Sequence, residues 1–249
     1  MKKQIDINCD MGEGFPFDAE IMPFISSANI ACGGHAGDAT TIRNTIQQCI
    51  KQGVAAGAHP SYPDKENFGR IKMTISEGEL INSIMDQVFL FDAIAKECGT
   101  KMHHIKLHGA LYNLASNNHQ LAEQIIDTFL VYKKEIYLYG LSGSVYNQLA
   151  REKGFLVLDE VFADRTYQSD ACLTPRNIQG ALIEDDQQAI NQVLGLAHEQ
   201  KVITLTGEEI AVNADTICIH GDGAHAVSFA SLIHHELTLR NFQIQAPLL

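Results

Sequence analysis

The chain has 249 residues, of which 45% are hydrophobic and 19% are charged, and its formal net charge is −12. This length suits one large domain, and the apolar fraction is sufficient to bury a substantial core. The acidic balance argues against nucleic acid or an anionic membrane surface as a partner, because both require basic side chains on the protein.

The sequence also carries no signal for export. Its first residues lack an apolar h-region, and no window reaches the roughly 18 consecutive apolar residues of a membrane-spanning helix. The six cysteines are scattered without a Cys-x-x-Cys pair, which is typical of reduced thiols. We therefore expect a cytoplasmic protein.

Short apolar runs recur along the chain, and most are followed by a turn containing Gly, His or Asp. Seven of them are expected to form strands, at 4–9, 28–32, 54–58, 105–107, 136–141, 156–162 and 216–219. Runs that are short and apolar on both faces are typical of buried parallel strands.

Amphipathic segments lie between these runs and are expected to form helices. The predicted helices span 41–52, 80–97, 117–132, 144–153, 186–200 and 224–240. Asp38 can cap the first, and Ser76 with Glu79 forms a capping-box pattern before the second. This alternation predicts a parallel sheet, open or closed, within a single domain over residues 1–249.

Two shorter features interrupt the alternation. Residues 202–205 and 210–212 flank a Gly-containing turn and are expected to form a small antiparallel hairpin, inserted before the last strand. Residues 64–73 form a polar, irregular loop that is long enough to act as a lid.

Polar side chains gather directly after the predicted strands. They are Asp10, Glu13, His35, Asp38, His59, Lys106, His108, Glu160, Asp164, Arg165, His220 and Asp222. Because the carboxyl ends of parallel strands face one side of a sheet or barrel, these side chains should converge. Four strands that each end near a histidine favour a functional pocket over simple capping.

Individual residues of this set also have simpler interpretations, in which their role is structural and not functional. Asp38 is better explained as an N-cap than as a catalyst. Lys106 and Arg165 have structural ion pairs as alternatives to ligand binding, with Asp10 or Glu160 as the partner of Lys106. The sequence His220-Gly221-Asp222 is either an imidazole–carboxylate pair or a tight turn, and Arg70 in the lid is either a partner for a substrate carboxylate or a surface residue.

Several chemistries lack support. The chain contains no phosphate-binding loop, no Gly-x-Gly-x-x-Gly fingerprint and no Gly-x-Ser-x-Gly elbow, so ATP or NAD binding and a serine nucleophile are disfavoured. Histidine and aspartate from separate strands can bind a divalent metal, with Asp10, His35 and His59 as the candidate ligands. No local spacing such as His-Glu-x-x-His supports that metal site.

Seven motifs together resemble the LamB/YcsF family in order and over nearly the whole chain. They are 8–13, 29–38, 57–64, 106–113, 160–167, 173–176 and 217–222. The sequence departs from the family pattern at Ala39, Asn67, Ile71 and Leu107, which questions details of the lid more than of the pocket.

The resemblance implies the A subunit of bacterial 5-oxoprolinase, which cleaves 5-oxoproline (pyroglutamate) to L-glutamate coupled to ATP hydrolysis, in a complex with B and C subunits. It also implies a seven-stranded parallel β/α barrel of the kind found in polysaccharide deacetylases. Because this chain lacks a phosphate loop, activation by ATP is expected to occur through the partner subunits.

With this resemblance, two sets of site residues are predicted. The catalytic set is Asp10, His35, His59, His108 and Asp222. The substrate-binding set is Glu13, Arg70, Lys106, Asn113, Glu160, Arg165 and His220. Asp10, His35 or His59 would activate water, a cation among Lys106, Arg70 and Arg165 would hold a carboxylate or phosphoryl group, and backbone amides after Gly33 would hold the oxyanion.

Two other functions stay open on the sequence alone. One is a metal-dependent deacetylase acting on an N-acetylated sugar, and the other is a subunit that binds small acids without catalysis. A homo-oligomer is also compatible with the sequence.

Overall fold

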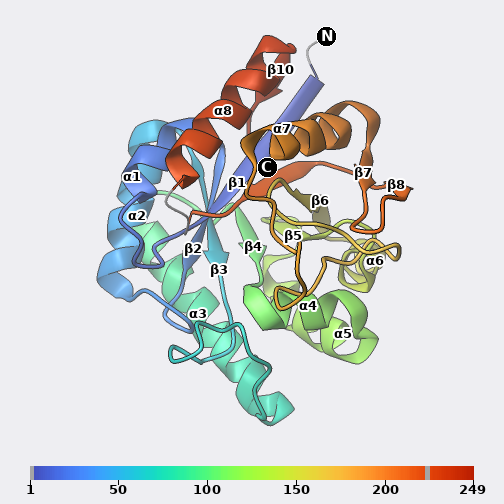
Figure 1. Cartoon of the computed structure of the whole chain (residues 1–249). Coiled ribbons are helices and arrows are strands. Elements are labelled where there is room, and N and C mark those ends of the chain that lie inside the picture. Colours follow the sequence, from blue (N-terminus) through green and yellow to red (C-terminus); the bar gives the residue numbers. More distant parts are fainter. Residues whose placement is uncertain (1–2, 222–224) are drawn as a thin grey trace.

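Seven parallel strands close into a barrel that is surrounded by helices (Figure 1). The structure is a computed structural model, which describes residues 3–221 and 225–249. Around the barrel the strands are β1 (Lys3–Met11), β2 (Ser27–Ala31), β3 (Ala55–His59), β4 (His104–Lys106), β5 (Tyr137–Leu141), β6 (Leu156–Phe162) and β9 (Thr216–Ile219). Pairing of β9 with β1, in register from Asp6 opposite Thr216, closes the barrel. The predicted parallel β/α fold is therefore confirmed, and its sheet is a closed barrel, not an open sheet.

The barrel strands are buried because both of their faces are covered. All five residues of β2 are buried, and the residues of β1 from Ile5 to Met11 are buried except for the half-buried Asp10. The interior is partly polar: the Asp6 carboxylate accepts hydrogen bonds from the hydroxyls of Ser26, Ser27 and Thr216 at 2.6–2.7 Å. These bonds satisfy a carboxylate that would otherwise be costly to bury.

Helices cover the outside of the barrel. They are α1 (Asp18–Ile21), α2 (Ala39–Gln52), α3 (Glu77–Glu97), α4 (Gly109–Asn117), α5 (His119–Thr128), α6 (Val145–Glu152), α7 (Asp186–Leu194) and α8 (Ala226–Leu239), with single wider or tighter turns at Met22–Phe24, Phe129–Tyr132 and Gly195–Glu199. The predicted caps are confirmed: Asp38 accepts from the amide of Thr41, and Ser76 forms a reciprocal capping box with Glu79.

The prediction of one helix over 117–132 was wrong in its extent. Helix α4 starts eight residues earlier, immediately after His108, and ends where Asn118 caps the separate helix α5. The amide of Ala110 in its first turn donates to the carbonyl oxygen of Gly69, so a contact with the lid stabilises a start that the sequence pattern did not indicate. This early start places the first turn of α4 at the pocket.

Two features lie outside the barrel ring. The predicted hairpin is present as β7 (Lys201–Ile203) and β8 (Glu209–Ala211). An unpredicted strand, β10 (Phe242–Ile244), pairs with the first residues of β1. Beyond it the carbonyl of Pro247 accepts from His103, so the end of the described chain crosses the amino ends of the strands. Within the described ranges, no helix combines the length and apolar character needed to cross a membrane.

Candidate functional site

A pocket of about 720 Å³ opens at the carboxyl ends of the barrel strands. Nine of the twelve predicted site residues line it: Asp10, Glu13, His59, Arg70, Lys106, His108, Asn113, Arg165 and His220. His35 and Glu160 lie behind this lining, both buried. Asp222 falls outside the described residues. The convergence predicted from strand ends is therefore observed for residues that are up to 210 positions apart in the chain.

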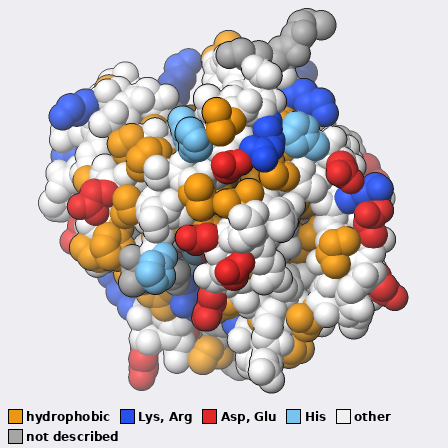
Figure 2. Space-filling model, turned by 45° about the horizontal axis from the view of Figure 1, so that its top comes forward, with side chains coloured by type: hydrophobic (Ala, Val, Ile, Leu, Met, Phe, Trp, Pro, Cys, Tyr) orange, Lys and Arg blue, Asp and Glu red, His pale blue; other side chains and the backbone are white. Residues whose placement is uncertain are grey.

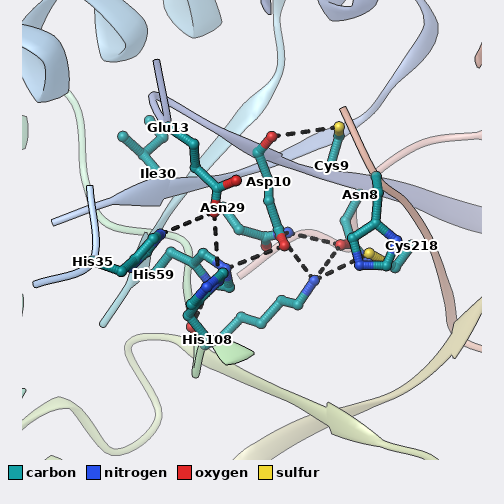
Figure 3. Close-up of polar contacts among 12 residues, drawn as sticks. Asn8, Cys9, Asp10, Glu13, Asn29, Ile30, His35, His59, His108 and Cys218 are labelled. Carbon is teal, nitrogen blue, oxygen red and sulfur yellow. Dashed lines mark hydrogen bonds and ion pairs between the residues drawn. The ribbon is translucent and has the colours of Figure 1, made fainter. Parts of the chain in front are cut away.

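Asp10, at the end of β1, has its carboxylate fixed from three sides (Figure 3). Its Oδ1 accepts from Lys106 Nζ at 2.9 Å and from Asn29 Nδ2 at 2.8 Å, and its Oδ2 lies 3.3 Å from His59 Nε2. Burial raises the pKa of Asp10, but the positive charges of His59 and Lys106 outweigh it and hold this pKa well below the usual range. Asp10 is therefore a carboxylate at neutral pH.

His59 and His108 share a proton in this network. His59 Nδ1 is 2.8 Å from the carbonyl oxygen of Lys106, and His108 Nε2 is 3.0 Å from that of Phe68. Carbonyl oxygens only accept, so both of these nitrogens carry hydrogen. The remaining nitrogens, His59 Nε2 and His108 Nδ1, lie 2.9 Å apart.

Two lone pairs cannot face each other at that distance, so one of these nitrogens must also be protonated. Burial, followed by the charges of His59 and His35, lowers the pKa of His108 well below its usual value. One hydrogen therefore lies between His59 Nε2 and His108 Nδ1, beside the Asp10 carboxylate. The site thus holds a carboxylate next to two imidazoles that share one extra hydrogen.

Glu13 connects a third histidine to this pair. Its Oε1 lies 2.9 Å from His35 Nε2 and 3.4 Å from His108 Nδ1. The His35 ring stacks on the His108 ring with centroids 3.7 Å apart. Burial lowers the pKa of His35, although the hydrogen bond to Glu13 opposes this. His35 therefore supports Glu13 and His108 from behind the pocket wall.

Lys106 makes internal ion pairs with both of the acids expected from the sequence. Its Nζ is 2.9 Å from Asp10 and 2.8 Å from the fully buried Glu160, and it also donates to Cys218 Sγ and Asn8. Burial lowers the pKa of Lys106, but Asp10 and its other neighbours hold this pKa well above the usual value. Its three N–H groups are already engaged, which favours a role in fixing Asp10.

The lid, residues 64–73, seals one side of the histidine cluster. Phe68 has a left-handed backbone (φ 55°), and its ring packs edge-on against His35 and His108, with centroids 5.2 and 5.6 Å away. Gly69 follows with φ 62°, and a Cβ there would lie 3.0 Å from His35 Cβ and 3.1 Å from His108 Cδ2. The guanidinium of Arg70 lies 4.9 Å above the Phe68 ring. A bulky residue such as Phe68 rarely adopts a left-handed backbone, which indicates that packing against the histidines imposes the shape of the lid.

On the side of the pocket formed by the loops after β6 and β9, a hydrogen-bond chain runs from Asp164 through His220 to Arg176. Asp164 lies 2.8 Å from His220 Nδ1, and Arg176 Nη2 lies 3.1 Å from His220 Nε2. Arg176 can only donate, so in this contact His220 Nε2 is the acceptor and Nδ1 donates to Asp164. Arg165 is buried nearby and donates to the carbonyl oxygen of Thr174 at 2.6 Å.

Asp10, His35 and His59 were the candidate ligands in case a metal is bound, but the geometry groups other atoms. Glu13, His35, His59 and His108 offer ligand atoms that all lie within 4.8 Å of one another. However, the stacked rings of His35 and His108 are inclined by only 3°, with centroids 3.7 Å apart, so their lone pairs lie in two separate parallel planes and cannot both point at one ion. In this conformation the cluster fits a shared proton better than a tetrahedral metal.

A second group, Asp10 with Cys218 and His220, also brings its ligand atoms within 4.8 Å. The ammonium of Lys106 already contacts Asp10 and Cys218, and both ring nitrogens of His220 have hydrogen-bond partners. Lys106 therefore supplies the positive charge that these ligand atoms would otherwise attract from a metal ion.

Several residues that shape the site were not in the predicted set. Asn29 bridges Asp10, Asn8 and His104, and Arg176 lines the pocket. Both lie within motifs that carry the family resemblance, which was the only signal for them. Conversely, the amides after Gly33 do not contribute to the described pocket lining, and Gly33 N donates to the carbonyl of Ala36.

Side chains of both signs are mixed on the face of the molecule drawn in Figure 2. Figure 2 shows acidic, basic and apolar side chains interspersed over one face, with no continuous field of one sign. The six cysteines are all free of disulfides, and burial raises the pKa of Cys32 to about 12. Cys32 accepts a hydrogen bond from the His59 amide, so its thiol packs beneath the site.

Fold and site together define a seven-stranded barrel with a histidine–carboxylate centre. The chain matches the LamB/YcsF family model over residues 5–248, and it belongs to that family. It is 46% identical over 248 residues to the A subunit of 5-oxoprolinase from Tolumonas auensis, covering 98% of this chain and 99% of the relative. It is 45% identical to the protein of the same name from Brevibacillus brevis, with 98% of each chain covered.

Solved structures agree with the family assignment. The lactam utilization protein from Thermus thermophilus superposes with a TM-score of 0.91 at 35% identity, covering 98% of this chain and 100% of that one. Peptidoglycan deacetylase PdaC from Bacillus subtilis aligns with a TM-score of 0.52 at 14% identity, over 98% of this chain and 87% of that one. The second likeness is one of fold alone.

Proposed function

We propose that this chain opens the ring of 5-oxoproline to give L-glutamate, within an ATP-hydrolysing complex with B and C subunits. Its relatives are named as the A subunit of 5-oxoprolinase, and the Thermus relative is named for lactam utilization, so a cyclic amide is the substrate that these names support. The observation that carries the proposal is the pairing of the Asp10 carboxylate with His59 in one pocket, at 3.3 Å.

This pair can supply both proton transfers of amide hydrolysis. The Asp10 carboxylate removes a proton from water as the water oxygen attacks the lactam carbonyl carbon. As the carbon–nitrogen bond breaks, His59 gives its proton to the leaving ring nitrogen, and the product is the open-chain amino acid. His108 holds His59 in position, and Lys106 holds Asp10.

Activation by ATP is assigned to the partner subunits. An amide is a poor electrophile, so unassisted attack is slow, and this chain contains no phosphate-binding loop. The division of labour also explains why a pocket built for acid–base chemistry forms part of an ATP-dependent reaction.

The test combines purified chain with its B and C subunits, ATP and 5-oxoproline, and measures glutamate. Asp10→Asn keeps the shape but removes the base, so we expect glutamate formation to fall by about 100-fold or more. The control is Asp186→Asn, a change at an exposed acid in the first turn of α7. Full turnover by the Asp10→Asn complex would favour a non-catalytic binding role, and deacetylation of an N-acetylated sugar by this chain alone would favour the other alternative.

A further inference from the structure

The pocket contains a second cluster of charges that the proposed proton transfers do not use. It is formed by Arg165 and Arg176 together with Asp164 and His220, on the loops that follow β6 and β9. The pocket volume of about 720 Å³ is in the range of sites for drug-sized ligands, and exceeds what one five-membered lactam fills. A further group bound beside the lactam would explain both the space and the charge.

Arg176 is held in place by the hydrogen-bond chain described above. The carboxylate of Asp164 fixes the tautomer of His220, and the free lone pair of His220 then receives one N–H of Arg176. Burial raises the pKa of Asp164, but its neighbours His220, Arg176 and Arg165 outweigh it and lower this pKa. Among the described contacts, only this one N–H of Arg176 is engaged, and a guanidinium has five.

Arg165 is a buried cation with an unused donor. It is 5% exposed, it donates to Thr174, and its Nε is buried without a hydrogen-bond partner in the described structure. No carboxylate described here lies within 4.0 Å of it. Burial, and then the charge of Arg176, lowers the pKa of Arg165 to about 10, so it stays positive at neutral pH. A buried donor left unpaired is costly unless a ligand accepts from it.

The charges around this cluster do not balance. Two guanidiniums repel each other across one carboxylate, in a protein whose overall charge is −12. His220 connects this cluster to the reaction centre, because one of its ring nitrogens lies within 4.8 Å of the Asp10 carboxylate. An anion bound by the two arginines would therefore lie next to the group that the proposed reaction attacks.

We propose that Arg165 and Arg176 form a subsite for a phosphoryl group, either carried on a ligand or present as free phosphate. A phosphoryl dianion offers three acceptor oxygens and matches two cations, whereas a carboxylate offers one charge and two oxygens. Asp164 and His220 act as positioning residues for Arg176. The proposal deepens the proposed function, and it rests on that function only for the link between this subsite and ring opening.

The test measures binding of small anions to the full chain by calorimetry at constant ionic strength. The probes are inorganic phosphate, O-phosphoserine, acetate and 5-oxoproline. We expect both phosphoryl compounds to bind at least about tenfold more tightly than acetate, and Arg176→Gln to weaken phosphate binding by about tenfold. Arg176 is exposed, so this variant should fold normally.

Two comparisons make the outcome decisive. Arg43→Gln removes a half-exposed arginine that pairs with Glu97 on α3, and it should leave phosphate binding unchanged. His220→Gln keeps an acceptor for Arg176 and should bind phosphate better than His220→Ala, which a purely structural role would not predict. Equal affinity for acetate and phosphate, or wild-type phosphate binding by Arg176→Gln, would overturn the subsite. Selective phosphate binding with no glutamate from the complex would instead reject the proposed function and retain the subsite.

Discussion

His59 Nε2 and His108 Nδ1 lie 2.9 Å apart, although each imidazole already donates its other N–H to a backbone carbonyl. The two rings are nearly perpendicular, at 86°. Because the backbone carbonyls of Lys106 and Phe68 each hold one N–H, a further hydrogen must lie between the two facing nitrogens.

Replacing His108 should therefore damage the reaction without contacting the reacting bond. In His108→Ala the acceptor for the His59 proton is lost, and the ring of His59 loses a support. We expect glutamate formation by the complex to fall by about 100-fold. The comparison is His119→Ala, at an exposed histidine in the first turn of α5. Equal losses in both variants would contradict the assignment.

Removing the central cation should affect folding more than any surface charge. In Lys106→Met, Asp10 and the fully buried Glu160 lose their partner, which should cost about 3–5 kcal/mol in the free energy of unfolding. The double variant Lys106→Met/Glu160→Gln should recover part of this loss. Urea titration measures both, and Lys201→Met, which breaks an exposed pair with Glu209, should stay near wild type. An unchanged midpoint in Lys106→Met would refute the argument.

The lid should be sensitive to a single added methyl group. Gly69→Ala places Cβ against His35 and His108 in a left-handed conformation that alanine resists, so the lid must move away from the pocket. We expect a clear loss of kcat/KM for 5-oxoproline in the complex. Gly78→Ala is the matched control, because Gly78 has open space around it and no positive φ. Similar kinetics for both variants would show that the lid does not shape the site.

Acid should destabilise the fold at pH values where most buried acids are still ionised. Burial lowers the pKa of His35, His103, His104 and His108 in the folded chain. The unfolded chain therefore binds more protons below its histidine pKa of about 6.5, and stability should fall as pH decreases through that value. Each such histidine contributes a slope of up to about 1.4 kcal/mol per pH unit.

The measurement is the urea midpoint at several pH values between about 8 and about 5, which bracket the histidine range. Wild type and His119→Gln should lose stability alike, since residue 119 is exposed. A stability that is flat or increases on acidification would show that the buried histidines are already charged in the folded state.

The histidine cluster should not require a metal. The parallel planes of His35 and His108 do not direct two lone pairs at one ion, and a hydrogen shared by His59 and His108 occupies the space between their facing nitrogens. We expect the complex to keep its glutamate formation after this chain is treated with a chelator and dialysed. Stoichiometric zinc in the purified chain, with activity lost on its removal and restored on its return, would overturn this interpretation.

Local patterns predicted the elements of this fold well. Runs such as 156–162 and 216–219 coincide with the observed strands, because a short run that is apolar on both faces has few other stable placements. Ser76 and Glu79 indicated a helix start through a purely local hydrogen bond. Local patterns did not predict closure of the barrel, because the pairing of β9 with β1 joins residues that are far apart in the chain, such as Asp6 and Thr216.

The site, like the fold, could be predicted only in part from local sequence patterns. That Asp10, His59 and His108 would meet was predicted from their positions after strands. The sequence did not predict that Glu160 is buried behind Lys106. It also did not predict that the carbonyl of Phe68 orients His108. Those relationships depend on tertiary packing of a lid and on backbone atoms, which are the same in every sequence.

The residues after β10 run across the amino ends of the barrel strands, where His103 donates to Pro247 and Tyr137 donates to Leu248. They follow every barrel strand in the chain, so these two contacts connect the last described residues to the starts of β4 and β5. The segment therefore braces the barrel from the end opposite the histidine centre, without contributing a residue to the pocket lining described here.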